Sequence, residues 1–161
     1  MTAEEIITKL NMLPHPEGGY YRETYRGEQE IAVADGKKRN TATAIYYLLK
    51  DKDKSHLHRL CSDEIWLFHQ GEPLEIVTIS EEGKYEMVTL GNRLDQQEVP
   101  QVAIKANVWF GARVKNGKGY ALVSCMVAPG FDFEDFELGK KEELQRAFPH
   151  LRKEIEEMCL L

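Results

Sequence analysis

The sequence predicts a mainly β protein, a sandwich or barrel of antiparallel strands with short helices at both ends. Three observations indicate this fold class. Between residues 43 and 128 the chain is a series of short segments rich in β-branched and aromatic residues. Turn signals such as EEGK at 81–84 and NGKG at 116–119 separate these segments. Helical spacing occurs only near the two ends, and a length of 161 residues suits a single domain over 1–161.

The first forty residues contain one predicted helix followed by extended chain. In TAEEIITKL, residues 2–10, Thr2 is a suitable N-cap and the apolar residues fall on one face. The segment LPHPEGGYYRET, residues 13–24, carries two prolines and a Gly pair, which predicts a loop or extended chain. The polar segment 27–40 contains an Asp-Gly turn signal and is expected to form a hairpin or loop.

Strands are predicted through the middle of the chain and helices at its end. The strand segments combine β-branched and aromatic residues, several of them with alternating bulky side chains. The predicted strands are 43–49, 64–69, 74–79, 85–90, 101–105, 108–114 and 120–128. Near the end of the chain the spacing becomes helical over 140–148 and 149–161, with Pro149 at the first position of the last helix.

The composition excludes several classes of partner. The formal net charge of -6 and the pI of about 5.4 give a surface that repels phosphate backbones, so nucleic acid is not expected as a partner. No segment approaches the ~18 apolar residues of a membrane span, and the first residues lack the pattern of a signal peptide. Three widely spaced cysteines indicate neither a disulfide framework nor a metal knuckle, which favours a cytoplasmic location.

The stretch SHLHRLCSDEIWLFHQGEPLEI, residues 55–76, carries the strongest chemical signal. His56 and His58 are two residues apart, so on a regular strand both side chains point to the same face. Glu64 follows in an apolar run, where a carboxylate is either paired or has a raised pKa. The three side chains could hold Fe, Mn, Zn or Ni, or His58 and Glu64 could form an acid–base pair.

The same stretch resembles the first sequence motif of the cupin superfamily, through His56, His58, Glu64 and Gly71. The segment that corresponds to the second motif is KANVWF, residues 105–110. There Asn107 stands where the motif has Gly, and Asn tolerates a left-handed backbone. Phe110 stands where the motif has its last metal-binding His. Because this His is missing, we expect no cofactor, although a divalent metal held by His56, His58 and Glu64 stays an alternative.

A finer resemblance is to the cupin subfamily that is called sugar-epimerase-like and long catalogued as a domain of unknown function. The matching segments, in the family's order, are 15–24, 43–49, 55–76, 108–113 and 123–138. The resemblance implies a double-stranded β-helix, which is a jelly-roll barrel, and a homodimer. It also implies similarity to the epimerase-type cupins that act on nucleotide sugars.

Further candidate ligand-binding residues lie outside this stretch. Glu17 precedes the Gly pair at 18–19 and Arg22 follows it, and a loop with two glycines can approach a ligand closely. Tyr20, directly after the pair, could donate a proton. Two tryptophans, Trp66 and Trp109, lie in strands expected to line the barrel, and aromatic walls suit sugar rings or nucleobases. Two aromatic residues after a Pro-Gly turn, Phe131 and Phe133, are expected to close the barrel mouth.

The residues together favour a protein that binds a small polar metabolite, such as a sugar or a sugar nucleotide, inside the barrel. The first hypothesis is a metal-independent isomerase or epimerase with His58 as the base, Glu64 as its orienting partner and Tyr20 as the acid. The second is a metal-dependent cupin enzyme with His56, His58 and Glu64 as ligands. The third is a non-enzymatic cupin that binds a small molecule.

Overall fold

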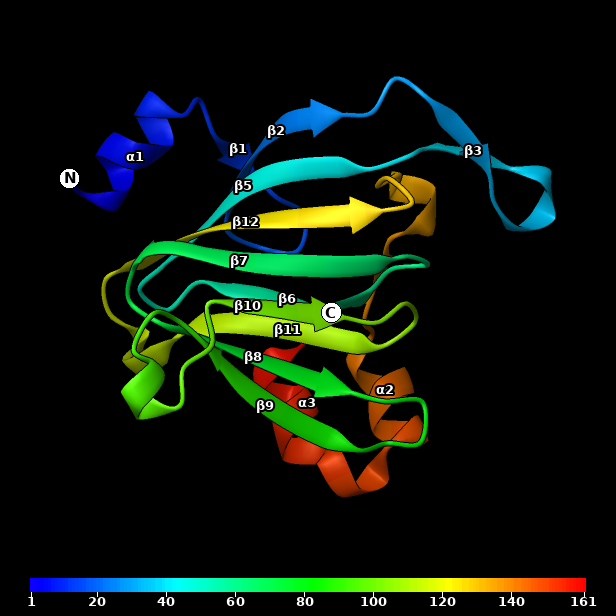
Figure 1. Cartoon of the computed structure of the whole chain (residues 1–161). Helices are drawn as coiled ribbons and strands as arrows, with labels where there is room; N and C mark the ends of the chain where they lie inside the picture. Colours follow the sequence, from blue (N-terminus) through cyan, green and yellow to red (C-terminus); the bar gives the residue numbers. More distant parts are fainter.

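Two antiparallel sheets face each other and enclose the main hydrophobic core (Figure 1). The structure is a computed structural model that describes residues 1–161. The larger sheet has six strands, in spatial order β1 (Leu13–Pro14), β2 (Tyr20–Arg26), β5 (Thr43–Lys50), β12 (Tyr120–Ala128), β7 (Asp63–Gly71) and β10 (Gln101–Ile104). The smaller sheet has five, in the order β13 (Glu137–Leu138), β6 (Lys54–Arg59), β11 (Trp109–Val114), β8 (Leu74–Ile79) and β9 (Tyr85–Leu90).

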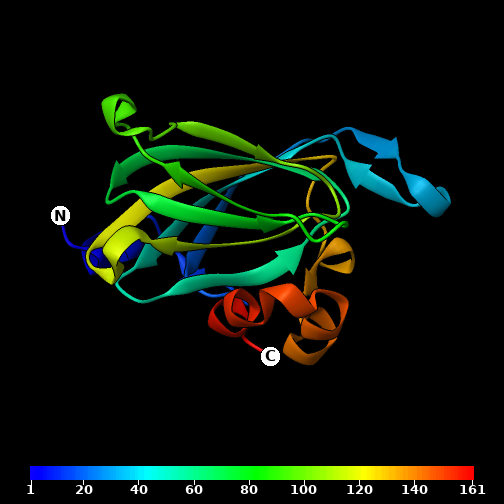
Figure 2. The ribbon, with the colours of Figure 1, turned by 90° about the horizontal axis from the view of Figure 1, so that it is seen from below.

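Short helices and one hairpin lie outside the two sheets. The hairpin pairs β3 (Glu30–Ala32) with β4 (Lys38–Asn40) and extends away from the barrel in both views (Figures 1 and 2). The helices are α1 (Ala3–Lys9), α2 (Lys141–Ala147) and α3 (Arg152–Met158), and the 3-10 turns are η1 (Ala34–Gly36), η2 (Leu94–Gln96), η3 (Lys115–Gly117), η4 (Phe133–Asp135) and η5 (Pro149–Leu151). None of these helices is long and apolar enough to cross a membrane.

Each sheet buries its inner face in the barrel, and the terminal helices cover parts of the outer faces. Inside the barrel, Tyr47, Trp66 and Phe110 are the largest fully buried side chains. At the C-terminal end, α2 and α3 pack against the smaller sheet (Figure 2), where Ile155 meets a second apolar cluster. At the N-terminal end, α1 packs near Leu48 of β5. This arrangement leaves one end of the barrel free for a cavity.

The predicted class, a mainly β barrel with short helices at both ends, is confirmed. Alternation and flanking turn residues gave strands 74–79, 85–90 and 120–128 the bounds that the structure shows. Thr2 caps α1 as expected, with a reciprocal hydrogen bond between its backbone N–H and the Glu5 side chain. The helix predicted over 149–161 was too long, because Pro149 begins the 3-10 turn η5 and α3 starts only at Arg152.

Gly18 lets the loop before β2 approach β6 closely. Its φ is +114°, and an added Cβ would lie 1.9 Å from the backbone oxygen of Lys54. Gly36 also has a positive φ, +70°, but an added Cβ there would meet nothing within 4 Å. We therefore expect Gly18→Ala to lower the free energy of unfolding by roughly 3 kcal/mol or more, and Gly36→Ala by only about 1–2 kcal/mol. Urea denaturation of both variants checks this, and equal losses would contradict the close approach.

Candidate functional site

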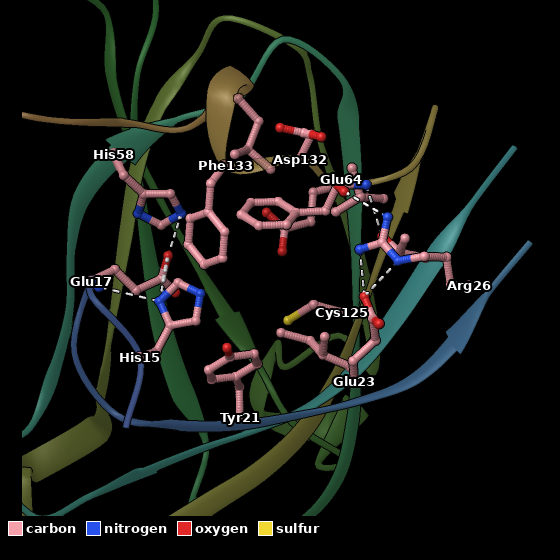
Figure 3. Close-up of a pocket in the computed structure, with 15 residues that line it drawn as sticks. His15, Glu17, Tyr21, Glu23, Arg26, His58, Glu64, Cys125, Asp132 and Phe133 are labelled. Atoms are coloured by element: carbon pink, nitrogen blue, oxygen red, sulfur yellow. Dashed lines mark hydrogen bonds and ion pairs between the residues drawn. The ribbon is translucent and has the colours of Figure 1, made fainter. Parts of the chain in front are cut away.

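A cavity of about 460 Å³ opens at one end of the barrel, between the loop before β2, the inner face of the larger sheet and the segment around η4 (Figure 3). Its polar and ionisable lining residues are His15, Glu17, Tyr21, Glu23, Arg26, Thr43, His58, Glu64, Cys125 and Asp132. Its apolar lining residues are Ile45, Leu60, Val127, Phe131 and Phe133. We refer to this space as the barrel cavity.

A buried ion pair forms one wall of the barrel cavity. The Nε2 atom of His58 lies 2.9 Å from Oε2 of Glu17, and both side chains are almost fully shielded from solvent. The Ser55 hydroxyl donates to the other carboxylate oxygen of Glu17 at 2.9 Å. The Nδ1 atom of His58 lies 2.7 Å from the backbone oxygen of His56, which can only accept a hydrogen bond. Both ring nitrogens of His58 are therefore occupied, as in an imidazolium that donates twice.

Each charged group of this pair stabilises the ionised form of the other. Burial alone would raise the pKa of Glu17, but the charge and hydrogen bond of His58, with help from His15 and Ser55, lower it to about 2. Burial alone would lower the pKa of His58, and the Glu17 carboxylate overcomes this effect and raises it. The wall therefore carries a carboxylate beside an imidazolium whose two N–H groups both face acceptors.

Glu64 behaves in the opposite way. Its carboxyl group is buried, and Oε2 has no hydrogen-bond partner. Burial, followed by the negative charge of Glu17, raises the pKa of Glu64 to about 7, and the nearby His58 cation lowers it only in part. A carboxyl group with this pKa can both accept and release a proton at neutral pH, as general acid–base catalysis requires.

His15 contributes a neutral imidazole. Its Nδ1 atom accepts a hydrogen bond from the backbone N–H of Glu17 at 3.1 Å, which places the ring proton on Nε2. Burial lowers the pKa of His15, although the Glu17 carboxylate opposes this. The free nitrogen faces the interior of the barrel cavity (Figure 3), so His15 offers an N–H donor to a bound molecule.

The mouth of the barrel cavity is held by Arg26. Its guanidinium donates to Oε1 of Glu23 at 2.6 and 3.1 Å, and to Asn40 and the backbone oxygen of Phe131 at 2.9 and 3.1 Å. The bond to Phe131 ties β2 to the segment around η4. Phe131 and Phe133 pack edge to face there, with ring centroids 4.9 Å apart.

The structure brings half of the predicted site residues to the barrel cavity. These are Glu17, His58, Glu64, Phe131 and Phe133. The expected partnership differs, however, because His58 is hydrogen-bonded to Glu17 and not to Glu64. The predicted residues that do not line the cavity are Tyr20, Arg22, His56, Trp66 and Trp109.

Strand alternation explains why Tyr20 and Arg22 are not in the cavity. Successive side chains of β2 point to opposite faces, so Tyr21 and Glu23 face the barrel cavity instead. Tyr20 packs with the apolar cluster beneath α1, and Arg22 is exposed. Tyr21, and not Tyr20, is therefore the tyrosine that lines the cavity.

The two tryptophans pack in apolar cores rather than lining the cavity. Trp66 is fully buried deeper in the barrel, between Tyr47 and Phe110, with ring centroids 5.6 and 6.2 Å away. Trp109 belongs to the cluster beneath α2 and α3, because its neighbour Phe110 takes the inward position on β11.

A β-bulge separates His56 from His58. Phe110 of β11 pairs with His58 and Ala112 pairs with Ser55, so β6 has one residue more than β11 over this span. The bulge brings Ser55 and His58 to Glu17 and breaks the alternation that would place both histidines on one face. The backbone N–H and Nδ1 of His56 instead lie 2.8 and 2.7 Å from the backbone oxygen of Glu17.

The side chains therefore do not fit the alternative metal site of His56, His58 and Glu64. No group of three His, Cys, Asp or Glu side chains is arranged to hold a metal ion. Phe110, at the position of the last metal-binding His of the second motif, packs on His58 with ring centroids 4.1 Å apart. Asn107 has the expected left-handed backbone, with φ of 65°. The expected lack of a cofactor stays a prediction.

Sequence reasoning missed several residues of the site, among them His15, Tyr21, Glu23, Arg26, Cys125 and Asp132. His15 and Tyr21 lie in the segment 13–24, which was singled out for its Gly pair, but their orientation depends on the pairing of β2. A second bulge in β2, opposite Ile45 and Ala44, lets Glu23 and Arg26 both face the mouth. No pattern in the sequence indicates this bulge.

Comparisons with known proteins identify the family to which the chain is similar. The model of the family described as cupin superfamily, DUF985, matches residues 4–139. An uncharacterized protein of Saccharomyces cerevisiae is 29% identical over 154 residues, which covers 87% of this chain and 76% of the yeast protein. Neither description names an activity.

Solved structures show the same architecture. A hypothetical protein from Leishmania major has a TM-score of 0.94 and 37% identity, with 99% of both chains covered. A protein from Shewanella oneidensis has a TM-score of 0.90 and 38% identity, with 99% of this chain and 98% of that chain covered. Oxalate decarboxylase from Bacillus subtilis has a TM-score of 0.57 and 16% identity, with 90% of this chain and 36% of that chain covered, and shows the fold alone.

Proposed function

Because the chain belongs to the cupin superfamily family DUF985 and has its jelly-roll fold, we propose that the barrel cavity is the active site of a metal-independent isomerase or epimerase. The substrate is a small polar carbonyl compound, such as a sugar or a sugar nucleotide whose sugar carries a keto group. One observation carries the proposal: Glu64, whose pKa is raised to about 7, lies in the same cavity as the fixed His58 cation. Acid–base sites typically contain two ionisable groups whose surroundings shift their pKa values, so that one exchanges protons while the other stays charged.

Glu64 is the base in this proposal, rather than His58. Both ring nitrogens of His58 are occupied, whereas the carboxyl group of Glu64 lines the cavity without an ion-pair partner. The Glu64 carboxylate removes a proton from the carbon next to the substrate carbonyl. The C–H electron pair forms a C=C bond, and the π pair of the carbonyl moves to its oxygen to give an enolate. His15 Nε2 donates a hydrogen bond to that oxygen, and the His58 cation stabilises its negative charge.

Return of the proton determines the product. When protonated Glu64 gives its proton to the former carbonyl carbon, and the hydroxyl proton of the carbon that was deprotonated moves to the former carbonyl oxygen, the carbonyl group changes place and the product is an isomer. When the Tyr21 hydroxyl gives a proton to the opposite face of the original carbon, the product is an epimer. Tyr21 then regains a proton from solvent and protonated Glu64 releases its proton to solvent, so no oxidant or co-reactant is needed.

Deuterium uptake from solvent tests this function. The protein is incubated in D₂O with a panel of aldoses, ketoses and sugar nucleotides, and loss of the proton next to the carbonyl is followed by NMR. We expect uptake with at least one compound, and we expect Glu64→Gln to reduce the rate by about 100-fold or more, because it removes the base. The exposed variant Glu142→Gln, on α2, should keep the full rate.

The outcomes separate the rival functions. Full uptake by Glu64→Gln would contradict the role of this residue. A compound that binds the cavity and never exchanges would identify a non-enzymatic binding protein. Uptake that is lost with a chelator and restored by a divalent metal would identify a metal-dependent enzyme.

A further inference from the structure

We infer that the ligand of the barrel cavity is an uncharged polyhydroxy carbonyl compound, a free sugar, and not a phosphorylated sugar or a sugar nucleotide. This inference rests on the proposed function and narrows its substrate class. Three features of the cavity carry it: its charges, the hydrogen bonds of its arginine, and the carboxylate oxygens that remain free.

The lining of the barrel cavity is acidic. Four carboxyl groups line it, those of Glu17, Glu23, Glu64 and Asp132, against the single guanidinium of Arg26. The fixed cation of His58 is balanced by Glu17, at 2.9 Å. A phosphate group would bring negative charge into surroundings that already carry an excess of it, which disfavours binding.

The only arginine at the mouth is already engaged. Arg26 makes four hydrogen bonds, two to Glu23, one to Asn40 and one to the backbone oxygen of Phe131. Phosphate recognition needs N–H donors that can turn toward the anion. Four of the five N–H donors of Arg26 are thus engaged, so a bidentate phosphate clamp would require this side chain to release Glu23 or the segment around η4.

Two carboxylate oxygens at the mouth of the cavity are free acceptors. Oε1 of Glu23 receives both bonds from Arg26, which leaves Oε2 free, and Oδ1 of Asp132 accepts from the backbone N–H of Glu134, which leaves Oδ2 free. Hydroxyl groups of a sugar can donate to both oxygens, whereas phosphate oxygens cannot.

The aromatic side chains at the mouth suit the apolar faces of a sugar ring. Phe133 is 53% exposed at the cavity lining, which leaves ring surface free for contact. Phe131 stands edge to face against it at 4.9 Å and widens the apolar wall. A free sugar thus meets carboxylates along its hydroxyls and aromatic carbon along its C–H groups.

Paired ligands test the inference. Binding of free aldoses and ketoses, of their monophosphates, and of UDP and inorganic phosphate is measured by saturation-transfer NMR with the wild-type chain. We expect at least one free sugar to bind roughly tenfold more tightly than its own monophosphate, and neither UDP nor phosphate to compete. Asp132→Asn should weaken binding of the free sugar several-fold and reduce the ratio between the affinities for the free sugar and for its monophosphate. The matched surface variant Asp95→Asn should leave both affinities unchanged.

The results distinguish this inference from the proposed function. A monophosphate or sugar nucleotide that binds more tightly than its free sugar overturns the inference, and deuterium uptake by that compound would leave the proposed function standing. A free sugar that binds preferentially without uptake supports the inference and contradicts the proposed chemistry. Failure of every free sugar to bind overturns the inference.

Discussion

Glu17→Ala is expected to lower the free energy of unfolding by about 3 kcal/mol or more near pH 5.5. The change removes the carboxylate that neutralises the buried His58 and that accepts a hydrogen bond from the buried Ser55 hydroxyl. Each group is then left without its partner in surroundings that exclude water. Chemical denaturation measures the loss.

The pH dependence of this loss has a definite sign. The pKa of Glu17 is lowered from 4.5 to about 2, so its contribution is present above pH 4.5 and is lost as the pH falls toward 2. The pKa of His58 is raised from 6.5, so its contribution is present below pH 6.5 and is lost as the pH rises through the folded value. The difference between wild type and Glu17→Ala is therefore expected to be largest between pH 4.5 and 6.5.

An exposed ion pair supplies the matched control. Glu137 lies 2.7 Å from Arg59 but is about half exposed, so Glu137→Ala should cost less than about 1 kcal/mol. If Glu17→Ala costs no more than Glu137→Ala across this pH range, the buried pair does not have the strength assigned to it.

Glu64 is expected to titrate with a pKa of about 7, well above the ordinary value of 4.5. Burial is the main cause and the charge of Glu17 is the second. Glu98, in the loop before β10, is also shielded from solvent but shows the opposite shift in its pKa. It has only 2% of its surface exposed, but Arg93 donates to both of its carboxylate oxygens and its pKa is lowered. Glu64 has no such arginine, so the effect of burial remains.

The strands that form the barrel could be predicted because their signals are local. Alternating side chains and flanking turn residues define the strand over 74–79 without knowledge of its neighbours. Glu64 was also predictable as a residue with a perturbed pKa, because the residues around it in the sequence are apolar.

The partners within the site were not predictable, because they depend on register. Regular alternation would place His56 and His58 on one face of the strand. The bulge in β6 separates them, so that His58 and Ser55 both contact the Glu17 carboxylate. The bulge in β2 also breaks regular alternation, and it brings Glu23 and Arg26 to the same side of the strand, facing the cavity. One extra residue in a strand changes which side chains meet, and hydrophobic pattern alone does not locate it.

Glu64 is a buried carboxyl group that is expected to exchange protons near neutral pH. The most direct measurement is a ¹³C NMR titration of the glutamate side-chain carboxyl carbons, with Glu64→Gln used to assign the signal. We expect one glutamate signal with a midpoint of about 7 that is missing from the Glu64→Gln spectrum. A Glu64 signal that titrates near 4.5, the ordinary glutamate value, would show that this carboxyl group is not the proton-exchanging group of the cavity.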